Sequence, residues 1–237
     1  MVTTLYLIRH GSIEGGGAKR YNGGIDVPLS ATGVRQIEAA AAFVKAHLGN
    51  SAFSRHMSYL KDIQADGEGG TLEGEKEKAP ALSAVYCSDL SRAIRSAEII
   101  AAPFRLKPVV ASGLRERSFG IWEGMTFAEI KENYPLEFGL WSRNPLKYSP
   151  PQGENTGDVR DRAIDAFNGI VKNHEGDYVT VVAHGGINRI ILCHVLGAPL
   201  EHIFRIEQDY AAVNIIELWG KYPVVKLLNG RPDFGPL

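Results

Sequence analysis

The chain has 237 residues, of which 44% are hydrophobic and 22% are charged, and its formal net charge at neutral pH is −1. A chain of this length can bury a sizeable core, and we expect a single domain over 1–237 with an insertion at 49–80. A net charge this close to zero argues against a global field that would gather nucleic acid or an anionic membrane surface, so an anion site must be built locally.

Cysteine usage and hydropathy favour a protein of the reducing cytosol. Cys87 and Cys193 have no metal-type spacing and lie in apolar stretches, as buried reduced thiols do. The sequence shows no signal segment and no apolar run long enough to cross a bilayer. We therefore expect a cytoplasmic protein without membrane or nucleic-acid partners.

The first predicted element is a strand at 3–8, where β-branched and large apolar residues form a run typical of a strand buried on both faces. After a glycine-rich loop, apolar residues recur every 3.6 residues over 31–48, behind a Ser30 that suits a helix start. The stretch 49–80 loses this periodicity and ends glycine-rich and charged, which predicts weak order. A pair of short helices around 53–63 is an open alternative for part of it.

The remaining elements alternate between strand and helix. Helix patterns occur at 89–101, behind the N-cap candidate Ser88, and at 156–172 and 187–196. The segment 113–151 is rich in aromatic residues and prolines, and we expect it to cover one edge of the sheet. This alternation predicts an α/β fold, a three-layer αβα architecture with a largely parallel central sheet. The other strand patterns are at 84–87, 107–111, 178–183, 212–218 and 224–228.

Two histidines are predicted to emerge at the carboxyl ends of core strands. The strand at 3–8 runs into Arg9 and His10, and the strand at 178–183 runs into His184, each time followed by glycine. Ligands bind beyond the carboxyl ends of strands in parallel sheets, which is where these side chains would meet. One Arg-His-Gly tripeptide is weak evidence, but the pairing of two strand ends is far less accidental.

A third strand end adds positive charge to this predicted site. The strand at 84–87 leads into a helix that carries Arg92 in its first turn. Backbone N–H groups at a helix start and a guanidinium both favour a dianionic group such as phosphate. The sequence therefore predicts a compact phosphate site.

Several motifs resemble those of the histidine phosphatase superfamily, which has the phosphoglycerate-mutase-like fold, and within it those of the α-ribazole phosphatases and related small phosphatases. The resemblance implies a phosphomonoesterase that hydrolyses a small phosphate ester through a phosphohistidine intermediate, without metal or cofactor. It points to α-ribazole 5'-phosphate of cobalamin biosynthesis, whereas similar small phosphatases act on sugar phosphates and phosphoglycerates. The motifs, in chain order, are LIRHG, YNGGIDVPLSATGVRQ, YCSDLSRAIRSAEIIA, LRERSFGIWEG, PPQGENTGDVRDRAIDAF and VVAHGGINRIILCHVLG.

The resemblance also implies a role for each residue of the predicted site. His10 would be the nucleophile, and Arg9, Arg92 and His184 would hold the phosphate oxygens. Glu116 would protonate the leaving alcohol and then deprotonate the water that hydrolyses phosphohistidine. A histidine nucleophile needs one unprotonated nitrogen, so we expect its other ring nitrogen to donate to a backbone carbonyl. The arginines would offset charge on the transferred group.

The loop after the first strand departs from the family pattern. Members commonly carry an acidic residue, a threonine and a phosphate-contacting asparagine where this chain has Ser12, Ile13 and Gly16. Asn22 or the backbone of 15–17 is a candidate to replace this contact, and a loop that only turns is an open alternative.

Three further residues complete the predicted substrate-binding set: Gly23, Gly185 and Glu154. Gly23 lies in a retained part of the pattern near Asp26, for which a tight turn is favoured over substrate contact. The sequence QGEN resembles the G-E-S element of the phosphatases, so we expect Glu154 at the substrate mouth. An acidic residue favourable to the dipole of the helix at 156–172 would explain Glu154 equally well.

Other function classes are open at this stage. The region that forms the mutase lid reads WSRNPLKYSPPQGENTGDV and lacks the lid arginine pair, which favours a phosphatase over mutase-type phosphoryl transfer. A metal-dependent hydrolase built on His10 and His184 would need a third ligand, and none occurs at ligand spacing. A site that only binds a phosphorylated partner is another alternative. Homodimer formation is open as well.

Overall fold

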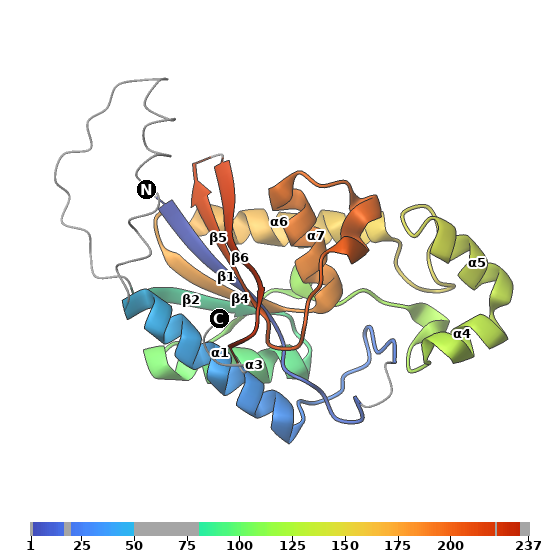
Figure 1. Ribbon diagram of the computed structural model, residues 1–237, viewed down its shortest axis with the longest axis horizontal. Helices are drawn as coiled ribbons and strands as arrows, with labels where there is room; N and C mark the ends of the chain where they lie inside the picture. Colours follow the sequence, from blue (N-terminus) through green and yellow to red (C-terminus); the bar gives the residue numbers. More distant parts are fainter. Residues whose placement is uncertain (1, 17–19, 50–80, 221, 233–237) are drawn as a thin grey trace.

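The computed structural model describes residues 2–16, 20–49, 81–220 and 222–232. Its strands form one six-stranded sheet with the order β3-β2-β4-β1-β5-β6 (Figure 1). The strands are β1 (Val2–Arg9), β2 (Leu82–Cys87), β3 (Val109–Val110), β4 (Tyr178–Ala183), β5 (Val213–Trp219) and β6 (Tyr222–Gly230).

The sheet is largely parallel, as predicted. β1 pairs in parallel with β4, β4 with β2, and β2 with β3, whereas β5 and β6 are antiparallel. The edge strand β3 is shorter than the predicted 107–111. Because β1, β2 and β4 run the same way, their carboxyl ends lie at the same end of the sheet, and the histidines predicted to form a site follow two of these strands.

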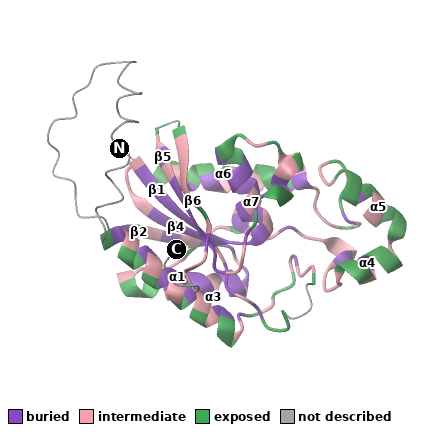
Figure 2. Ribbon diagram, viewed as in Figure 1, coloured by how far each residue is buried: buried purple, intermediate pink, exposed green. Residues whose placement is uncertain are grey.

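Helices cover both faces of the sheet and complete the predicted three-layer αβα architecture. Successive strand residues point to opposite faces, so Leu5 and Leu7 pack in the core under α6 and α7, whereas Tyr6 and Ile8 pack under α1 and α3. Figure 2 shows the central strands β1 and β4 as continuously buried, in contrast to the edge strands. Each fully buried leucine or isoleucine contributes roughly 1.5–3 kcal/mol. The four helices are α1 (Ala31–Gly49), α3 (Ser91–Ala101), α6 (Thr156–Asn173) and α7 (Gly185–Leu196).

Two helix starts differ from prediction. The helix α3 begins at Ser91 with Leu90 at its N-cap, so Ser88 is not the capping residue. Asp26, from a loop distant in sequence, accepts hydrogen bonds from the Ser91 N–H at 2.8 Å and the Ser91 hydroxyl at 2.7 Å. Asp26 thus accepts from a backbone N–H at the start of α3 that a nearby capping side chain would otherwise satisfy. The helix α7 begins two residues before the predicted 187, directly after His184.

The aromatic segment between β3 and α6 lies beyond the carboxyl ends of β1 and β4, not along an edge of the sheet as predicted (Figure 1). The segment packs around a small hydrophobic core of its own, formed by Trp122, Ile130 and Trp141. Because this core buries its apolar side chains, the segment does not need to pack on an edge of the sheet. Its helices are α4 (Phe127–Asn133) and α5 (Pro135–Arg143), with 3₁₀ turns at Ser112–Leu114 and Gly120–Trp122. Further 3₁₀ turns are at Ala102–Phe104 and Leu200–Arg205.

Some predictions fall outside the described residues. Apart from Gly49, which ends α1, the predicted insertion at 49–80 and its short helices lie there. Cys87 and Cys193 are buried free thiols, as predicted. No helix in the described ranges has the length and apolar character that a bilayer crossing requires.

Candidate active site

His10 directly follows β1 and is almost fully buried, with 4% of its surface exposed. Its Nδ1 lies 2.8 Å from the carbonyl oxygen of Gly11. A carbonyl only accepts, so Nδ1 carries the proton and Nε2 keeps its lone pair, as expected for a nucleophile. Burial, and then the positive charges of Arg9 and Arg92, hold the pKa of His10 well below its usual value. The ring is therefore neutral at physiological pH.

Gly11 allows the His10 loop to lie close to α1. A Cβ at this position would overlap the backbone of Gly33 in the first turn of that helix. The glycine after the histidine thus has a packing role, and it brings the loop under the carboxyl ends of the strands.

His184 lies beside His10 at the start of α7. The ring centroids are 5.0 Å apart with an interplanar angle of 64°. The side chain is fully buried, and burial, His10 and the two arginines hold its pKa well below the usual value. Its Nε2 lies 2.8 Å from the hydroxyl of Ser88, whereas its buried Nδ1 has no hydrogen-bond partner.

Arg9 is oriented by the loop before β5. Its Nη1 donates to the carbonyl of Gln208 at 2.6 Å, and its guanidinium carbon lies 3.9 Å from the ring centroid of Tyr210. The Tyr210 ring is also 5.6 Å from that of His10. The Nε of Arg9 is buried and unpartnered, like Nδ1 of His184. Gly185 lies beside Arg9, and a Cβ there would meet this guanidinium at 3.4 Å, an ordinary contact distance; its contact with substrate stays a prediction.

Arg92 is 2% exposed and is held by the loop that the sequence marked as substrate-binding. Its Nη2 donates to the carbonyl of Gly23 at 2.8 Å and its Nη1 to that of Ile25 at 2.7 Å. Gly23 has a φ of 47°, a left-handed backbone that favours glycine. Asn22 accepts from the Ile25 N–H at 2.7 Å and so closes the same turn. These contacts give Asn22 and Gly23 a part in holding Arg92, and their contact with substrate stays a prediction.

Glu116 reaches the start of α7 from the segment after β3. Its Oε1 accepts from the Arg117 N–H at 2.9 Å, and its Oε2 accepts from the Gly186 N–H at 3.1 Å. Gly186 is two positions after His184, so this hydrogen bond brings the Glu116 carboxylate to the same helix start as His184, although Glu116 is distant in sequence. The structure brings all five predicted catalytic residues to one end of the sheet.

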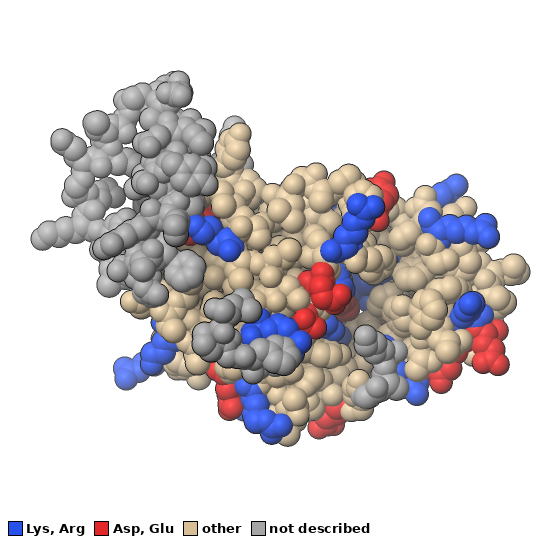
Figure 3. All heavy atoms as spheres, viewed as in Figure 1, with Lys and Arg blue, Asp and Glu red and all other residues tan. Residues whose placement is uncertain are grey.

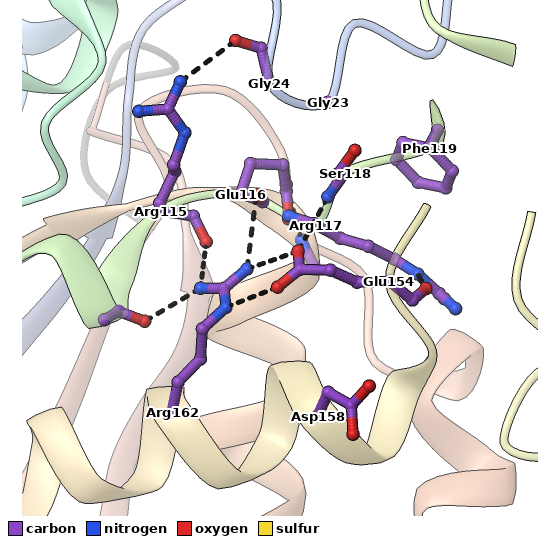
Figure 4. Close-up of polar contacts among 12 residues, drawn as sticks. Gly23, Gly24, Arg115, Glu116, Arg117, Ser118, Phe119, Glu154, Asp158 and Arg162 are labelled. Atoms are coloured by element: carbon purple, nitrogen blue, oxygen red, sulfur yellow. Dashed lines mark hydrogen bonds and ion pairs between the residues drawn. The ribbon is translucent and has the colours of Figure 1, made fainter. Parts of the chain in front are cut away.

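Both carboxylate oxygens of Glu154 accept hydrogen bonds from other residues of the protein. Its Oε1 and Oε2 accept from Arg162 at 2.9 and 2.8 Å, and Oε2 also accepts from the Ser118 N–H at 2.9 Å (Figure 4). Burial alone would raise the pKa of Glu154, but the hydrogen bonds from Arg162 and Ser118 outweigh it and lower the pKa. The residue precedes the N-cap Asn155 of α6 and so is not in the first turn, where the acidic residue is Asp158.

The arrangement suits a tetrahedral anion. Two buried nitrogens, Nε of Arg9 and Nδ1 of His184, lack partners near His10, whose Nε2 keeps its lone pair. Buried polar groups are normally hydrogen-bonded, so unpartnered ones mark a place for a ligand. Figure 3 shows acidic and basic side chains gathered around a hollow in the middle of the displayed face. Within the described ranges, no group of three His, Cys, Asp or Glu side chains is placed to hold a metal ion.

Comparison with known proteins decides the family. The family model of the histidine phosphatase superfamily, branch 1, matches residues 5–61 and 72–231. This chain is a member of the histidine phosphatase superfamily. The predicted phosphoglycerate-mutase-like fold is confirmed by the solved structures of this superfamily: the alpha-ribazole phosphatase from Shigella flexneri superposes with a TM-score of 0.74, covering 96% of each chain at 20% identity.

Two curated proteins are similar over most of this histidine phosphatase chain. A bifunctional protein of Mycobacterium tuberculosis is 30% identical over 217 residues, which are 92% of this chain and 50% of that protein. A metal-independent phosphoserine phosphatase of Arabidopsis thaliana is 32% identical over 200 residues, 83% of this chain and 70% of that protein. The chain spans about half the length of the mycobacterial relative it matches.

Sequence reasoning missed several residues of this histidine phosphatase site. Ser88 was assigned to a helix cap, yet it contacts His184. Tyr210 lies outside the quoted motifs, whereas Arg162 and Gly186 lie inside two of them but were not singled out. The HGG sequence is the one signal that could have singled out Gly186, because consecutive glycines after a strand indicate a close approach.

Proposed function

We propose that this protein is a phosphomonoesterase that acts through a phosphohistidine at Nε2 of His10. The observation that carries the proposal is the buried, neutral His10, its Nδ1 bonded to the Gly11 carbonyl, beside the unpartnered donors of Arg9 and His184. A neutral imidazole with a free lone pair is a nucleophile, and the unpartnered donors suit phosphate oxygens. The phosphoserine phosphatase among the similar proteins supports this choice.

The reaction proceeds in two steps in which protons and electrons balance. In the first, Nε2 of His10 attacks phosphorus, the ester P–O bond breaks, and Glu116 gives a proton to the leaving oxygen. In the second, Glu116 takes a proton from water, the oxygen of that water attacks phosphorus, and the P–N bond breaks to return neutral His10. Nδ1 keeps its proton throughout, because the Gly11 carbonyl can only accept.

Arg9, Arg92 and His184 stabilise the transferred group by charge and position. Phosphoryl transfer gives the protein little bond-making to do, so oriented donors supply most of the catalysis. For Nδ1 of His184 to donate, its Nε2 must accept, and the Ser88 hydroxyl at 2.8 Å supplies that proton when it points to His184 and not to the Asp89 carboxylate at 3.5 Å. Loss of one such donor typically removes about 2.7–4 kcal/mol of transition-state stabilisation.

The proposed substrate is a small phosphate monoester. The α-ribazole phosphatase of Shigella flexneri is 20% identical to this chain, so its similarity carries the fold and no substrate. The relative named as a metal-independent phosphoserine phosphatase is more similar in sequence, at 32%. A panel should therefore compare phosphoserine, α-ribazole 5'-phosphate, sugar phosphates and phosphoglycerates by kcat/KM.

The proposal is tested by rapid acid-free quenching with a ³²P-labelled ester. We expect phosphate bound to nitrogen, stable to alkali and labile to acid, in the wild-type protein and none in His10→Ala. Turnover that collapses in chelator and returns with a divalent metal would instead support the metal-dependent hydrolase. Interconversion of phosphoglycerates faster than their hydrolysis would support the mutase alternative.

A further inference from the structure

We propose that Arg162 is a positioning residue that fixes Glu116 against the start of α7. This inference rests on the proposed function for the role of Glu116, and it adds a residue of α6 that lies outside the predicted phosphate site. Arg162 acts through the backbone that carries Glu116 and through Glu154 (Figure 4).

Arg162 divides its guanidinium between the backbone around Glu116 and the carboxylate of Glu154. Its Nη1 donates to the carbonyls of Gly113 at 3.0 Å and Arg115 at 2.5 Å. Its Nη2 donates to the carbonyl of Glu116 at 3.3 Å and to Glu154 at 2.8 Å, and its Nε donates to Glu154 at 2.9 Å. A guanidinium has five N–H donors, so these five bonds occupy them all.

Glu154 extends this clamp to the other side of Glu116. The carboxylate that pairs with Arg162 also accepts from the Ser118 N–H at 2.9 Å. The segment is therefore held both before and after Glu116. Residues 115–119 belong to no helix or strand, so no regular ladder of hydrogen bonds fixes them. The Arg162–Glu154 pair takes the place of that ladder.

The opposite side of Glu116 leaves little room for error. Its Oε2 lies 3.1 Å from the Gly186 nitrogen, and a Cβ on Gly186 would lie only 2.5 Å from its Oε1. The helices that carry Arg162 and Gly186 share one hydrophobic core through Val159 and Ile187. Glu116 is thus held between two helices packed against each other, and loosening one side should displace its carboxylate.

Arg162→Lys tests the proposal, because lysine keeps the charge and loses the planar fork of donors. Arg160→Lys is the matched control: Arg160 lies on the same helix in an exposed pair with its neighbour Asp161. Each variant is assayed with p-nitrophenyl phosphate, whose leaving group departs without a proton, and with phosphoserine, whose alkoxide needs one. Inhibition by vanadate reports on the phosphate site, and thermal unfolding reports on the fold.

We expect Arg162→Lys to lower kcat/KM for phosphoserine by about 10²-fold, the scale of a misplaced general acid, because kcat/KM reports on formation of the phosphohistidine and not on its hydrolysis. The kcat/KM for p-nitrophenyl phosphate should fall far less, vanadate inhibition should persist, and Arg160→Lys should match the wild type. An equal fall for both esters, or no fall, would overturn the positioning role.

Crystal structures keep this inference separate from the proposed function. In Arg162→Met, and in Glu154→Gln if the first variant fails to fold, the Glu116 carboxylate should leave the Gly186 N–H. If the wild type hydrolyses neither ester, the proposed function fails, but these structures still show whether Arg162 positions Glu116. A Glu116 carboxylate that stays against the Gly186 N–H in the variant would overturn the positioning role of Arg162.

Discussion

Gly186→Ala should separate activity from stability in this protein. The added Cβ would lie 2.5 Å from Oε1 of Glu116, 3.3 Å from its Cδ and 3.4 Å from its Oε2. Because ordinary contacts begin at 3.4 Å, the oxygen has to retreat by about 0.9 Å. The atom that must move is the end of a flexible side chain, so the fold can absorb the methyl group while the carboxylate loses its position.

The expected loss of activity follows from this displacement. A misplacement of about 1 Å can cost about 10²-fold in rate, which corresponds to roughly 2.7 kcal/mol in activation free energy. Stability should be unchanged or higher, because alanine is favoured over glycine in helices by roughly 0.5–1 kcal/mol. We therefore expect kcat for an alkyl phosphate to fall about 10²-fold while the free energy of unfolding in urea does not fall.

Gly169→Ala is the matched control for this experiment. Gly169 lies in α6, and a Cβ there would meet nothing within 4 Å. This variant should gain the helical stabilisation and keep full activity. If Gly186→Ala retains wild-type kcat with alkyl esters, Glu116 does not act from the position described, and the reasoning is refuted.

Three further predictions follow from burial and hydrogen bonding at the site. The free energy of unfolding should decrease as the pH falls below 6.5, the ordinary pKa of histidine. Below that pH the unfolded chain binds protons at His10 and His184, whereas the lowered pKa values of the two rings keep them neutral in the folded protein. Urea titrations in phosphate-free buffer should give a slope of up to about 1.4 kcal/mol per pH unit for each ring, and His10→Gln should remove its share; an unchanged slope would contradict this. Arg92→Lys should lower kcat/KM by about 10²–10³-fold, because lysine cannot keep both carbonyl contacts and face phosphate. Ser88→Ala should lower the free energy of unfolding by about 1–3 kcal/mol, because it leaves Nε2 of buried His184 unpartnered, and equal unfolding curves would rule that contact out.

Much of the architecture followed from local patterns. The β-branched runs and the 3.6-residue period identify the elements, and alternation of strand with helix requires a largely parallel sheet. Parallel strands end on the same side, so His10 and His184 had to meet near Arg92. The hydrogen bond from Nδ1 of His10 to its neighbour Gly11 is also local, and it was predicted from the chemistry of the nucleophile.

The contacts that orient the site depend on tertiary structure. Asp26 bonds to Ser91 across 65 positions, where the sequence indicated only a turn. Glu154 was expected at the substrate mouth, which stays a prediction, and its pairing with Arg162 and Ser118 was not foreseen. Neither pairing has a periodicity that a sequence pattern could reveal.

The difference between these locally determined features and the tertiary contacts has a physical reason. Secondary structure and strand direction arise from backbone geometry and from the spacing of apolar residues, which are properties of neighbouring positions. The position of the Glu116 carboxylate depends on how α6 and α7 pack against each other. It also depends on the close approach of its Oε1 to Gly186, where a Cβ would leave no room. Distances of this kind are set only when separate segments close together around a common core.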